Sequence, residues 1–183
     1  MKELLERYPQ LNPCADPINT AVAAIIEGFR NGGKLLLCGN GGSCADCDHI
    51  VGELMKGFLK KRPLSADKKQ TMKQNCSDLD DNTLDSLQDG LPALSLCSLG
   101  ALNTAFCNDV NPELMYAQSV LGLGKAGYVL LCISTSGNAK NVCAAAMVAK
   151  ALGITVISLT GISGGKLSGL SDICICSQDQ RCL

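Results

Sequence analysis

Five short apolar runs, separated by segments with helical patterns, organise this sequence. They are rich in Leu, Ile, Val and Cys and lie at 35–38, 92–98, 128–133, 155–159 and 173–176. Short continuous apolar runs are typical of strands in a parallel sheet that is covered on both faces. The pattern therefore predicts an α/β fold, a three-layer sandwich in which helices flank a five-stranded parallel sheet.

Helical patterns occupy the segments between these runs. Asp16 and Pro17 offer an N-cap and a proline at the first helical position, and the apolar stripe that follows stops at Asn31-Gly32-Gly33. Other helices are expected at 2–8, after Ser43, and at 101–110, 112–121, 141–152 and 166–170. With 183 residues, the chain is expected to form one domain with a substantial core.

One segment, at about 59–90, lacks this apolar density. Its first part is basic and its second part is acidic. We interpret it as a charged helical insert that is exposed to solvent and whose two halves attract each other weakly. We prefer this interpretation to a binding arm, because a run of charges is usually a solvated face.

Charge and composition argue against several classes of function. The net charge is -1, which leaves no electrostatic footprint for nucleic acid. No apolar run reaches the roughly 18 residues of a membrane span, and the polar start of the sequence, MKELLERYPQ, does not resemble a signal peptide. We expect a cytoplasmic protein whose twelve cysteines stay reduced and pack as small hydrophobic side chains.

The first apolar run ends in a glycine turn, Gly39-Asn40-Gly41-Gly42, which leads to Ser43. Glycines adopt positive φ and let a ligand approach the backbone, and serine is a favoured N-cap residue. The serine hydroxyl and the free N–H groups of the helix that follows suit an anion such as a phosphate. The run at 129–139 ends in small hydroxyl residues and a glycine in the same way. Two such loops at the carboxyl ends of parallel strands predict one crevice for a ligand.

This glycine loop differs from the loops that bind nucleotides. The third glycine of a dinucleotide-binding pattern would fall at Cys44, and the acidic residue expected after a prompt second strand is missing. No phosphate-loop lysine follows the turn either. We therefore expect no nucleotide cofactor.

Several motifs, taken together, point to a known family. They are the loops 38–43 (CGNGGS) and 133–138 (ISTSGN), the helix residues Asp46, His49 and Glu53, the pair Asn108-Asp109, and the segments 159–161 (LTG) and 164–167 (GGKL). With these motifs the chain resembles the sugar isomerase (SIS) domain family, and within it the phosphoheptose isomerase group. The resemblance covers most of the chain except the insert. It implies a five-stranded parallel sheet whose strand ends bind sugar phosphates.

The resemblance also implies roles for individual residues. Glu53 would be the catalytic base in the aldose–ketose isomerisation of sedoheptulose 7-phosphate through an enediol. The substrate and its phosphate would be bound by Asn40, Gly41, Gly42, Ser43, Asn108, Asp109, Ser134, Thr135, Ser136 and Asn138. In zinc-bearing members the positions of His49 and Glu53 supply two metal ligands, so the implied cofactor is zinc. The family also implies a homotetramer with sites built between subunits.

His49 and Glu53 are four residues apart, so they project from one face of a helix, with Asp46 beside them. Taken alone, Glu53 would be a surface carboxylate and His49 a satisfied core histidine. The glycine loop directly upstream favours functional roles for both. Cys44 and Cys47 fall on the opposite side of the helix, so this CxxC pair is expected to pack rather than to share a metal with His49.

The sequence departs from the family pattern in two places. The pattern continues past the fifth strand into a long helix that carries a glutamine and a histidine, the usual partner acid and metal ligand. This sequence ends with 178–183 (QDQRCL), and His49 is its one histidine. We expect that the C-terminal helix is missing from a shortened chain, which would then be a poor isomerase. Ala139 also replaces a further serine, and this loss should weaken phosphate binding only modestly.

Two functions of different classes follow from these observations. The first is an enzyme, a phosphosugar isomerase, favoured by Glu53 and Asp109. The second is a phosphosugar-binding or protein-interaction module that kept the cradle and lost catalysis, as in a bacterial relative that engages the replication initiator. The absence of the final histidine favours the second. A sugar phosphate is the expected ligand in both cases.

Overall fold

The structure, a computed structural model, describes residues 2–177. Its centre is a five-stranded sheet in the order β2-β1-β3-β4-β5, and every neighbouring pair is parallel. The strands are β1 (Leu35–Gly39), β2 (Ala93–Ser95), β3 (Val129–Ser134), β4 (Thr155–Thr160) and β5 (Ile173–Cys176). The predicted α/β class and five parallel strands are confirmed. The expectation about a C-terminal helix concerns positions from 178 onward, outside the described residues.

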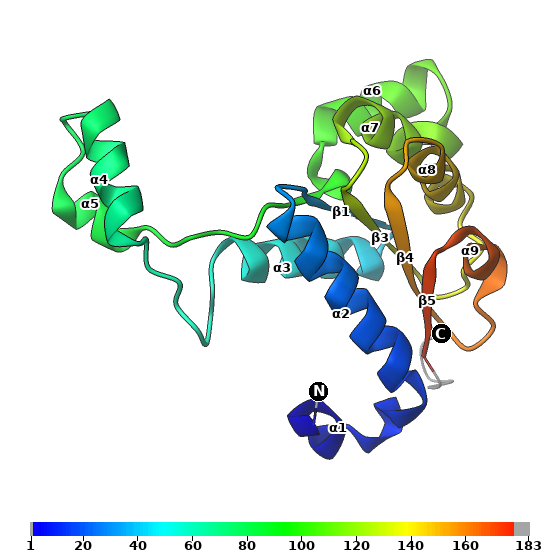
Figure 1. Ribbon diagram of the computed structural model, residues 1–183. Coiled ribbons are helices and arrows are strands. Elements are labelled where there is room, and N and C mark those ends of the chain that lie inside the picture. The colour runs from blue at the N-terminus through cyan, green and yellow to red at the C-terminus, as the bar shows by residue number, and fades with distance from the viewer. Residues whose placement is uncertain (1, 178–183) are drawn as a thin grey trace.

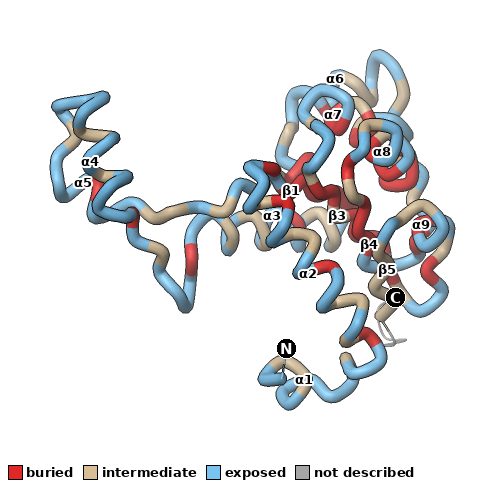
Figure 2. Tube along the Cα trace, viewed as in Figure 1, coloured by how far each residue is buried: buried red, intermediate tan, exposed pale blue. Residues whose placement is uncertain are grey.

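Helices cover both faces of this sheet (Figure 1). Helices α2 (Ala15–Arg30) and α3 (Gly42–Met55) pack on one face, where Leu35 and Leu37 point. Helices α7 (Met115–Leu123), α8 (Lys140–Ala151) and α9 (Gly165–Leu170) pack on the other, against Leu36 and Cys38. Successive strand residues thus serve opposite faces, and Figure 2 shows that the buried residues gather on the strands and the helices facing them. The predicted three-layer sandwich is confirmed.

The remaining elements connect these layers. They are α1 (Lys2–Arg7), η1 (Pro9–Cys14), η2 (Leu96–Ser98), α6 (Gly100–Asp109) and η3 (Pro112–Leu114). Helix α2 begins at Ala15, with Cys14 as its N-cap, so the predicted cap at Asp16 is wrong by two residues. Pro17 lies in the first turn, where a missing N–H group costs nothing.

The second strand is shorter than its apolar run. It ends at Ser95, and the predicted strand residues after it form the 3-10 turn η2. The Asn103 amide donates hydrogen bonds to the carbonyl oxygens of Leu96 (2.9 Å) and Cys97 (3.3 Å). These bonds take carbonyl groups that a longer edge strand would offer to the sheet, and the side chain of Leu96 becomes fully buried.

The segment predicted as a charged helical insert forms two short helices, α4 (Ala66–Asn75) and α5 (Asp81–Ser86). Figure 1 shows that they stand away from the sheet at the end of two extended connections. Lysines of the basic part pair with aspartates of the acidic part, in the pairs Lys68–Asp89, Lys69–Asp85 and Lys73–Asp81. The expected attraction between the two halves is confirmed, and the pairs are exposed enough to contribute little each.

The described cysteines behave largely as the composition predicts. All eleven within residues 2–177 are free, and Cys14, Cys38, Cys47, Cys132 and Cys143 are buried. Small apolar packing is therefore confirmed for these five. None of the helices in the described part of the chain has the length and apolar character needed to cross a membrane.

Candidate functional site

The glycine turn after β1 starts α3 earlier than the sequence suggests. The predicted N-cap, Ser43, is the second residue of the helix, and Gly41 occupies the cap position with φ of 56°. This left-handed conformation favours glycine, and it lets the chain turn sharply enough for the helix to begin at Gly42. The prediction of Ser43 as the cap is therefore wrong. Its hydroxyl caps no backbone N–H group, which leaves it available at the helix N-terminus.

The loop after β3 lies beside this turn. β3 ends at Ser134, whose carbonyl oxygen accepts a hydrogen bond from the Gly137 N–H group (2.9 Å), and α8 begins at Lys140. The two loops are joined by a pair of amides: Asn40 Nδ2 donates to Asn141 Oδ1, and Asn141 Nδ2 donates to Asn40 Oδ1, both at 2.9 Å. Two segments separated by about a hundred residues therefore form one edge.

A polar pocket of about 360 Å³ lies between these loops. It is lined by Asn40, Ser43, Ile133, Ser134, Thr135, Ser136 and Ala139. A smaller adjoining pocket of about 230 Å³ shares three of these residues and is lined by Ser43, Asp46, Ile133, Thr135, Leu159, Thr160, Gly161 and Ser177. The N-termini of α3 and α8 flank the lining, and free N–H groups with a positive dipole end favour an anion. Hydroxyl groups and two helix ends together can bind a phosphate.

The other predicted binding residues have different positions. Gly41 and Gly42 form the turn itself. Asn138 is tied to neighbouring loops, because its Nδ2 donates to the Ser136 carbonyl (2.9 Å) and its Oδ1 accepts from the Lys166 N–H group (3.1 Å). It therefore holds the loops after β3 and β4 together, and it lines neither of the two polar pockets.

Asn108 and Asp109 lie in the last turn of α6, where both are exposed. Asn108 Nδ2 donates a hydrogen bond to Asp109 Oδ1 (2.7 Å). Neither residue belongs to the lining of the two polar pockets. The structure does not bring this pair together with the hydroxyl residues within one chain, so their role in binding stays a prediction.

His49 and Glu53 are exposed on α3, which leads away from the polar pocket. A helix rises 1.5 Å per residue, so they lie about 9 Å and about 15 Å along the axis from Ser43. Asp46, on the same side of the helix, lines the smaller pocket. Cys47 is buried against the sheet, which confirms that it lies opposite His49.

The implied zinc site can be tested on these residues. Zinc in proteins takes three or four side-chain ligands, usually from Cys, His, Asp or Glu. Within residues 2–177 no three such residues gather in a way that could hold a metal ion. His49 and Glu53 of one chain are two exposed side chains, and they do not fit a zinc site by themselves.

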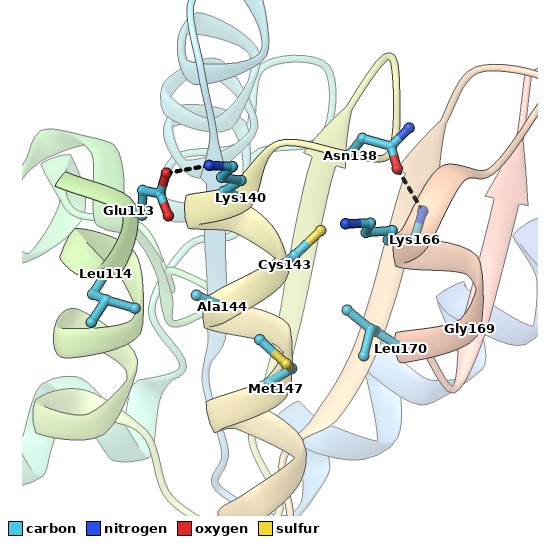
Figure 3. Close-up of a pocket in the computed structure, with 10 residues that line it drawn as sticks. All are labelled: Glu113, Leu114, Asn138, Lys140, Cys143, Ala144, Met147, Lys166, Gly169 and Leu170. Carbon is cyan, nitrogen blue, oxygen red and sulfur yellow. Dashed lines mark hydrogen bonds and ion pairs between the residues drawn. The ribbon is translucent and has the colours of Figure 1, made fainter. Parts of the chain in front are cut away.

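A larger groove of about 700 Å³ lies between η3, α8 and α9 (Figure 3). Leu114, Met147 and Leu170 give it an apolar wall, and a Lys140 Nζ–Glu113 Oε1 ion pair of 2.7 Å lies at one end. Hydrogen bonding to Glu113 raises the pKa of Lys140. This groove is mainly apolar and contains none of the predicted hydroxyl residues, so the polar pocket is the better candidate site for an anion.

Sequence reasoning missed two residues that shape the site. Asn141 pairs with Asn40. The sequence signal that could have identified Asn141 is its position as a second amide residue, in the first turn of the helix after the hydroxyl loop. The buried Tyr116 donates a hydrogen bond from its hydroxyl to the Gly39 carbonyl oxygen (2.6 Å) and so fixes the end of β1. Tyr116 and Gly39 are 77 positions apart, so no pattern in the local sequence predicts their contact.

Comparisons with known proteins agree with this geometry. The SIS domain family matches residues 1–86 and 90–161. The chain is 37% identical over 161 residues to the phosphoheptose isomerase of Roseiflexus sp. (strain RS-1), covering 87% of this chain and 68% of that protein. It is 36% identical over 174 residues to that of Helicobacter pylori (strain Shi470), covering 95% and 76%.

Solved structures show the same likeness. A phosphoheptose isomerase from Francisella tularensis superposes with a TM-score of 0.77 at 28% identity, covering 98% of this chain and 82% of that one. The enzyme from Neisseria gonorrhoeae gives a TM-score of 0.72 at 29% identity, covering 99% and 80%. The matched residues include both loops of the polar pocket and the whole of α3. The chain therefore belongs to the SIS domain family, in its phosphoheptose isomerase group.

Proposed function

We propose that this protein is a phosphosugar isomerase that interconverts sedoheptulose 7-phosphate and its aldose isomer. The observation that carries the proposal is the meeting of Ser43, Ser134, Thr135 and Ser136 with two helix N-termini in one pocket, from which α3 leads to Glu53. The relatives named phosphoheptose isomerase support it. A cytoplasmic location fits this substrate, because a charged phosphate ester does not cross membranes unaided.

The spacing along α3 fits a long, open-chain sugar. With the phosphate at Ser43, the carbon chain would run past Asp46 and His49 towards Glu53, about 15 Å along the helix axis. Glu53 would remove the proton from C1 of the ketose to form the enediol and return it to C2 to form the aldose. His49, one turn earlier on the same side, would move the proton between the two sugar oxygens. Zinc takes no part in this scheme.

The hydroxyl pocket makes a direct test possible. Sedoheptulose 7-phosphate should raise the Tm through mass action, whereas sedoheptulose should not. Ser43→Ala should weaken sugar-phosphate binding by about 10- to 100-fold, because a hydrogen bond to a charged group contributes about 1.5–3 kcal/mol. Calorimetric titration measures both ligands. Ser163→Ala, in the exposed loop after β4, is the control and should bind normally. Equal rises in Tm with sedoheptulose 7-phosphate and with sedoheptulose would contradict the proposal that this pocket binds the phosphate.

We also propose that the site is completed by a second copy of the chain. An apolar groove of about 470 Å³ lies between α2 and α3, lined by residues such as Ile25, Phe29 and Leu54. Val22 and Ile26, which also line the groove, are 47% and 43% exposed. A second copy seated on this face would cover the groove and approach the exposed side of α3, which carries His49 and Glu53.

The double variant Val22→Asp/Ile26→Asp should shift the protein from an oligomer to a monomer, because burying two carboxylates in an apolar interface is unfavourable. Sedimentation velocity measures the mass. Leu121→Asp, at a residue 58% exposed on the opposite layer, is the control and should leave the assembly unchanged. A monomeric unsubstituted protein, or an intact oligomer in the double variant, would contradict the proposed interface.

A non-catalytic sugar-phosphate-binding module is the second candidate. It is favoured by one observation: His49 and Glu53 lie outside the lining of both polar pockets. Turnover separates the two functions, because a binding module would show the phosphate-dependent rise in Tm without converting sedoheptulose 7-phosphate. Slow but measurable conversion, lost in a Glu53 variant, would favour the isomerase.

A further inference from the structure

The groove between η3, α8 and α9 has no role in the proposed isomerase reaction. Its volume of about 700 Å³ is within the range typical of sites for small molecules. It shares no lining residue with the two polar pockets. Ala139 lines the polar pocket, whereas its neighbours Asn138 and Lys140 line the groove. Consecutive residues of the loop after β3 therefore face two separate cavities.

The charged and the apolar residues of the groove lie at different ends (Figure 3). Lys140 and Lys166 lie near the start of α8, whereas Leu114, Met147 and Leu170 lie beside the following turns of that helix. Leu114 and Met147 are 41% and 53% exposed, so their apolar surface is open to a ligand. One end of the groove thus favours a negative group, and the other favours an apolar one.

Small residues line the middle of the groove. Cys143 and Ala144 on α8 are buried, with 7% and 6% of their surface exposed. A Cβ atom at Gly169 on α9 would meet open space among the described residues. Because these side chains are short, an apolar chain can lie close against α8. The groove therefore has room for an elongated apolar body as well as for a charged head group.

The two lysines at the charged end differ in their partners. Lys140 Nζ pairs with Glu113 Oε1 at 2.7 Å. Lys166 belongs to none of the ion pairs within the part of the chain that the structure describes. Its ammonium group points from α9 towards Cys143 on α8 (Figure 3), and it opposes the rise that burial causes in the pKa of that thiol. The groove therefore offers one positive charge to a ligand.

We propose that this groove binds an amphipathic carboxylate of the fatty-acid type. The carboxylate accepts a hydrogen bond from Lys166 Nζ, and hydrogen bonds between charged groups are stronger than those between neutral ones. The alkyl chain lies between Leu114, Met147 and Leu170, where the flexible Met147 side chain adapts to it. This site is separate from the polar pocket and does not depend on the proposed isomerase activity.

Charge and shape together favour this ligand over simpler ones. An inorganic anion would pair with Lys166 but would leave the exposed apolar surface of Leu114 and Met147 in water. A neutral hydrocarbon would cover that surface and leave the lysine without a partner. A carboxylic acid with a long chain satisfies both ends of the groove.

Methionine methyl groups give a local readout of binding. The chain contains five methionines, of which Met147 lines the groove, Met55 ends α3 and Met72 belongs to the insert. In protein with isotope-labelled methionine methyl groups, decanoate should shift the NMR signal of Met147 and leave those of Met55 and Met72 unchanged. Decanoate should bind about 4- to 16-fold more tightly than octanoate, because it buries two more methylene groups.

Variants separate the head of the ligand from its tail. Lys166→Ala should weaken the binding of decanoate by about 10-fold and leave that of decanol unchanged. Lys125→Ala, at an exposed lysine outside the groove, makes the same change in charge and should bind decanoate normally. Gly169→Leu should fill part of the groove and abolish the shift of Met147 with both ligands.

Four results would overturn the proposal. The first is equal affinity for decanoate in Lys166→Ala and the unsubstituted protein, and the second is a shift at Met55 or Met72 without one at Met147. The third is complete displacement of decanoate by sedoheptulose 7-phosphate, which would put the carboxylate in the polar pocket. The fourth is an unresponsive Met147 together with a lower mass of Gly169→Leu in sedimentation velocity, because a second copy would then cover the groove. If a variant fails to fold, the Met147 shift and the displacement experiment on the unsubstituted protein decide.

Discussion

Glu53→Gln should reduce kcat for sedoheptulose 7-phosphate by about 10²- to 10⁴-fold, the usual contribution of a positioned base. The amide keeps the shape of the side chain but cannot take up a proton. Glu53 is exposed in the last third of α3 and takes no part in the hydrogen bonds or ion pairs of the described residues. The substitution should therefore leave folding unchanged, and the rise in Tm caused by the sugar phosphate should stay nearly intact.

A matched control separates catalysis from general charge effects. Glu27→Gln removes an exposed carboxylate from the neighbouring helix α2 and keeps an oxygen that can accept from Asn31 Nδ2. It should convert substrate at the unsubstituted rate. Full activity in Glu53→Gln would show that another group is the base. Loss of the ligand-induced rise in Tm would show instead that Glu53 contributes to binding.

The strands and their parallel arrangement could be predicted because their signal is local and strong. Runs such as 35–38 are apolar throughout, since both faces of the sheet are covered, and helical patterns between them imply crossover connections. The end of β2 could not be predicted in the same way. Leu96 and Cys97 continue the apolar run, but the amide of Asn103 takes their carbonyl groups into a turn. The position where β2 ends therefore follows from hydrogen bonds between η2 and α6 and not from the local apolar pattern.

In the candidate site, too, the features with a local sequence signal could be predicted, and those that depend on contacts between distant segments could not. The hydroxyl pocket was predicted because Ser43 and the residues 134–136 each follow a strand, and the carboxyl ends of parallel strands share one edge. The starting point of α3 was misjudged because serine is usually the better cap, whereas the geometry of Gly41 depends on the turn as a whole. The pairing of Asn40 with Asn141 depends on the approach of two loops, which the sequence alone does not reveal.

The second large effect is expected at Gly137, in the loop after β3. Gly137 has φ of 64°, and a Cβ atom there would lie 2.1 Å from the Gly164 carbonyl oxygen. Its own carbonyl oxygen accepts a hydrogen bond from the Leu167 N–H group (3.0 Å). The loops after β3 and β4 are therefore locked against each other, with backbone rather than a flexible side chain as the obstacle.

Gly137→Ala should lower the free energy of unfolding by about 2–5 kcal/mol. The left-handed conformation costs a residue with a Cβ atom about 1–2 kcal/mol, and overpacking against backbone costs about 1–3 kcal/mol more. Because Ser134, Thr135 and Ser136 belong to the same loop, sugar-phosphate binding should be lost as well. Urea unfolding and calorimetric titration measure the two effects.

Gly32→Ala isolates the cost of the left-handed conformation from the cost of the clash. Gly32 has a similar φ of 74°, but nothing lies within 4 Å of where its Cβ would be, so this variant should lose only about 1–2 kcal/mol and bind the sugar phosphate normally. The difference between the two variants then measures the clash with Gly164. Equal losses would mean that the β4 loop moves aside freely. In that case the two loops would not be locked together, and the shape of the polar pocket would have to depend on the β1 and β3 loops alone.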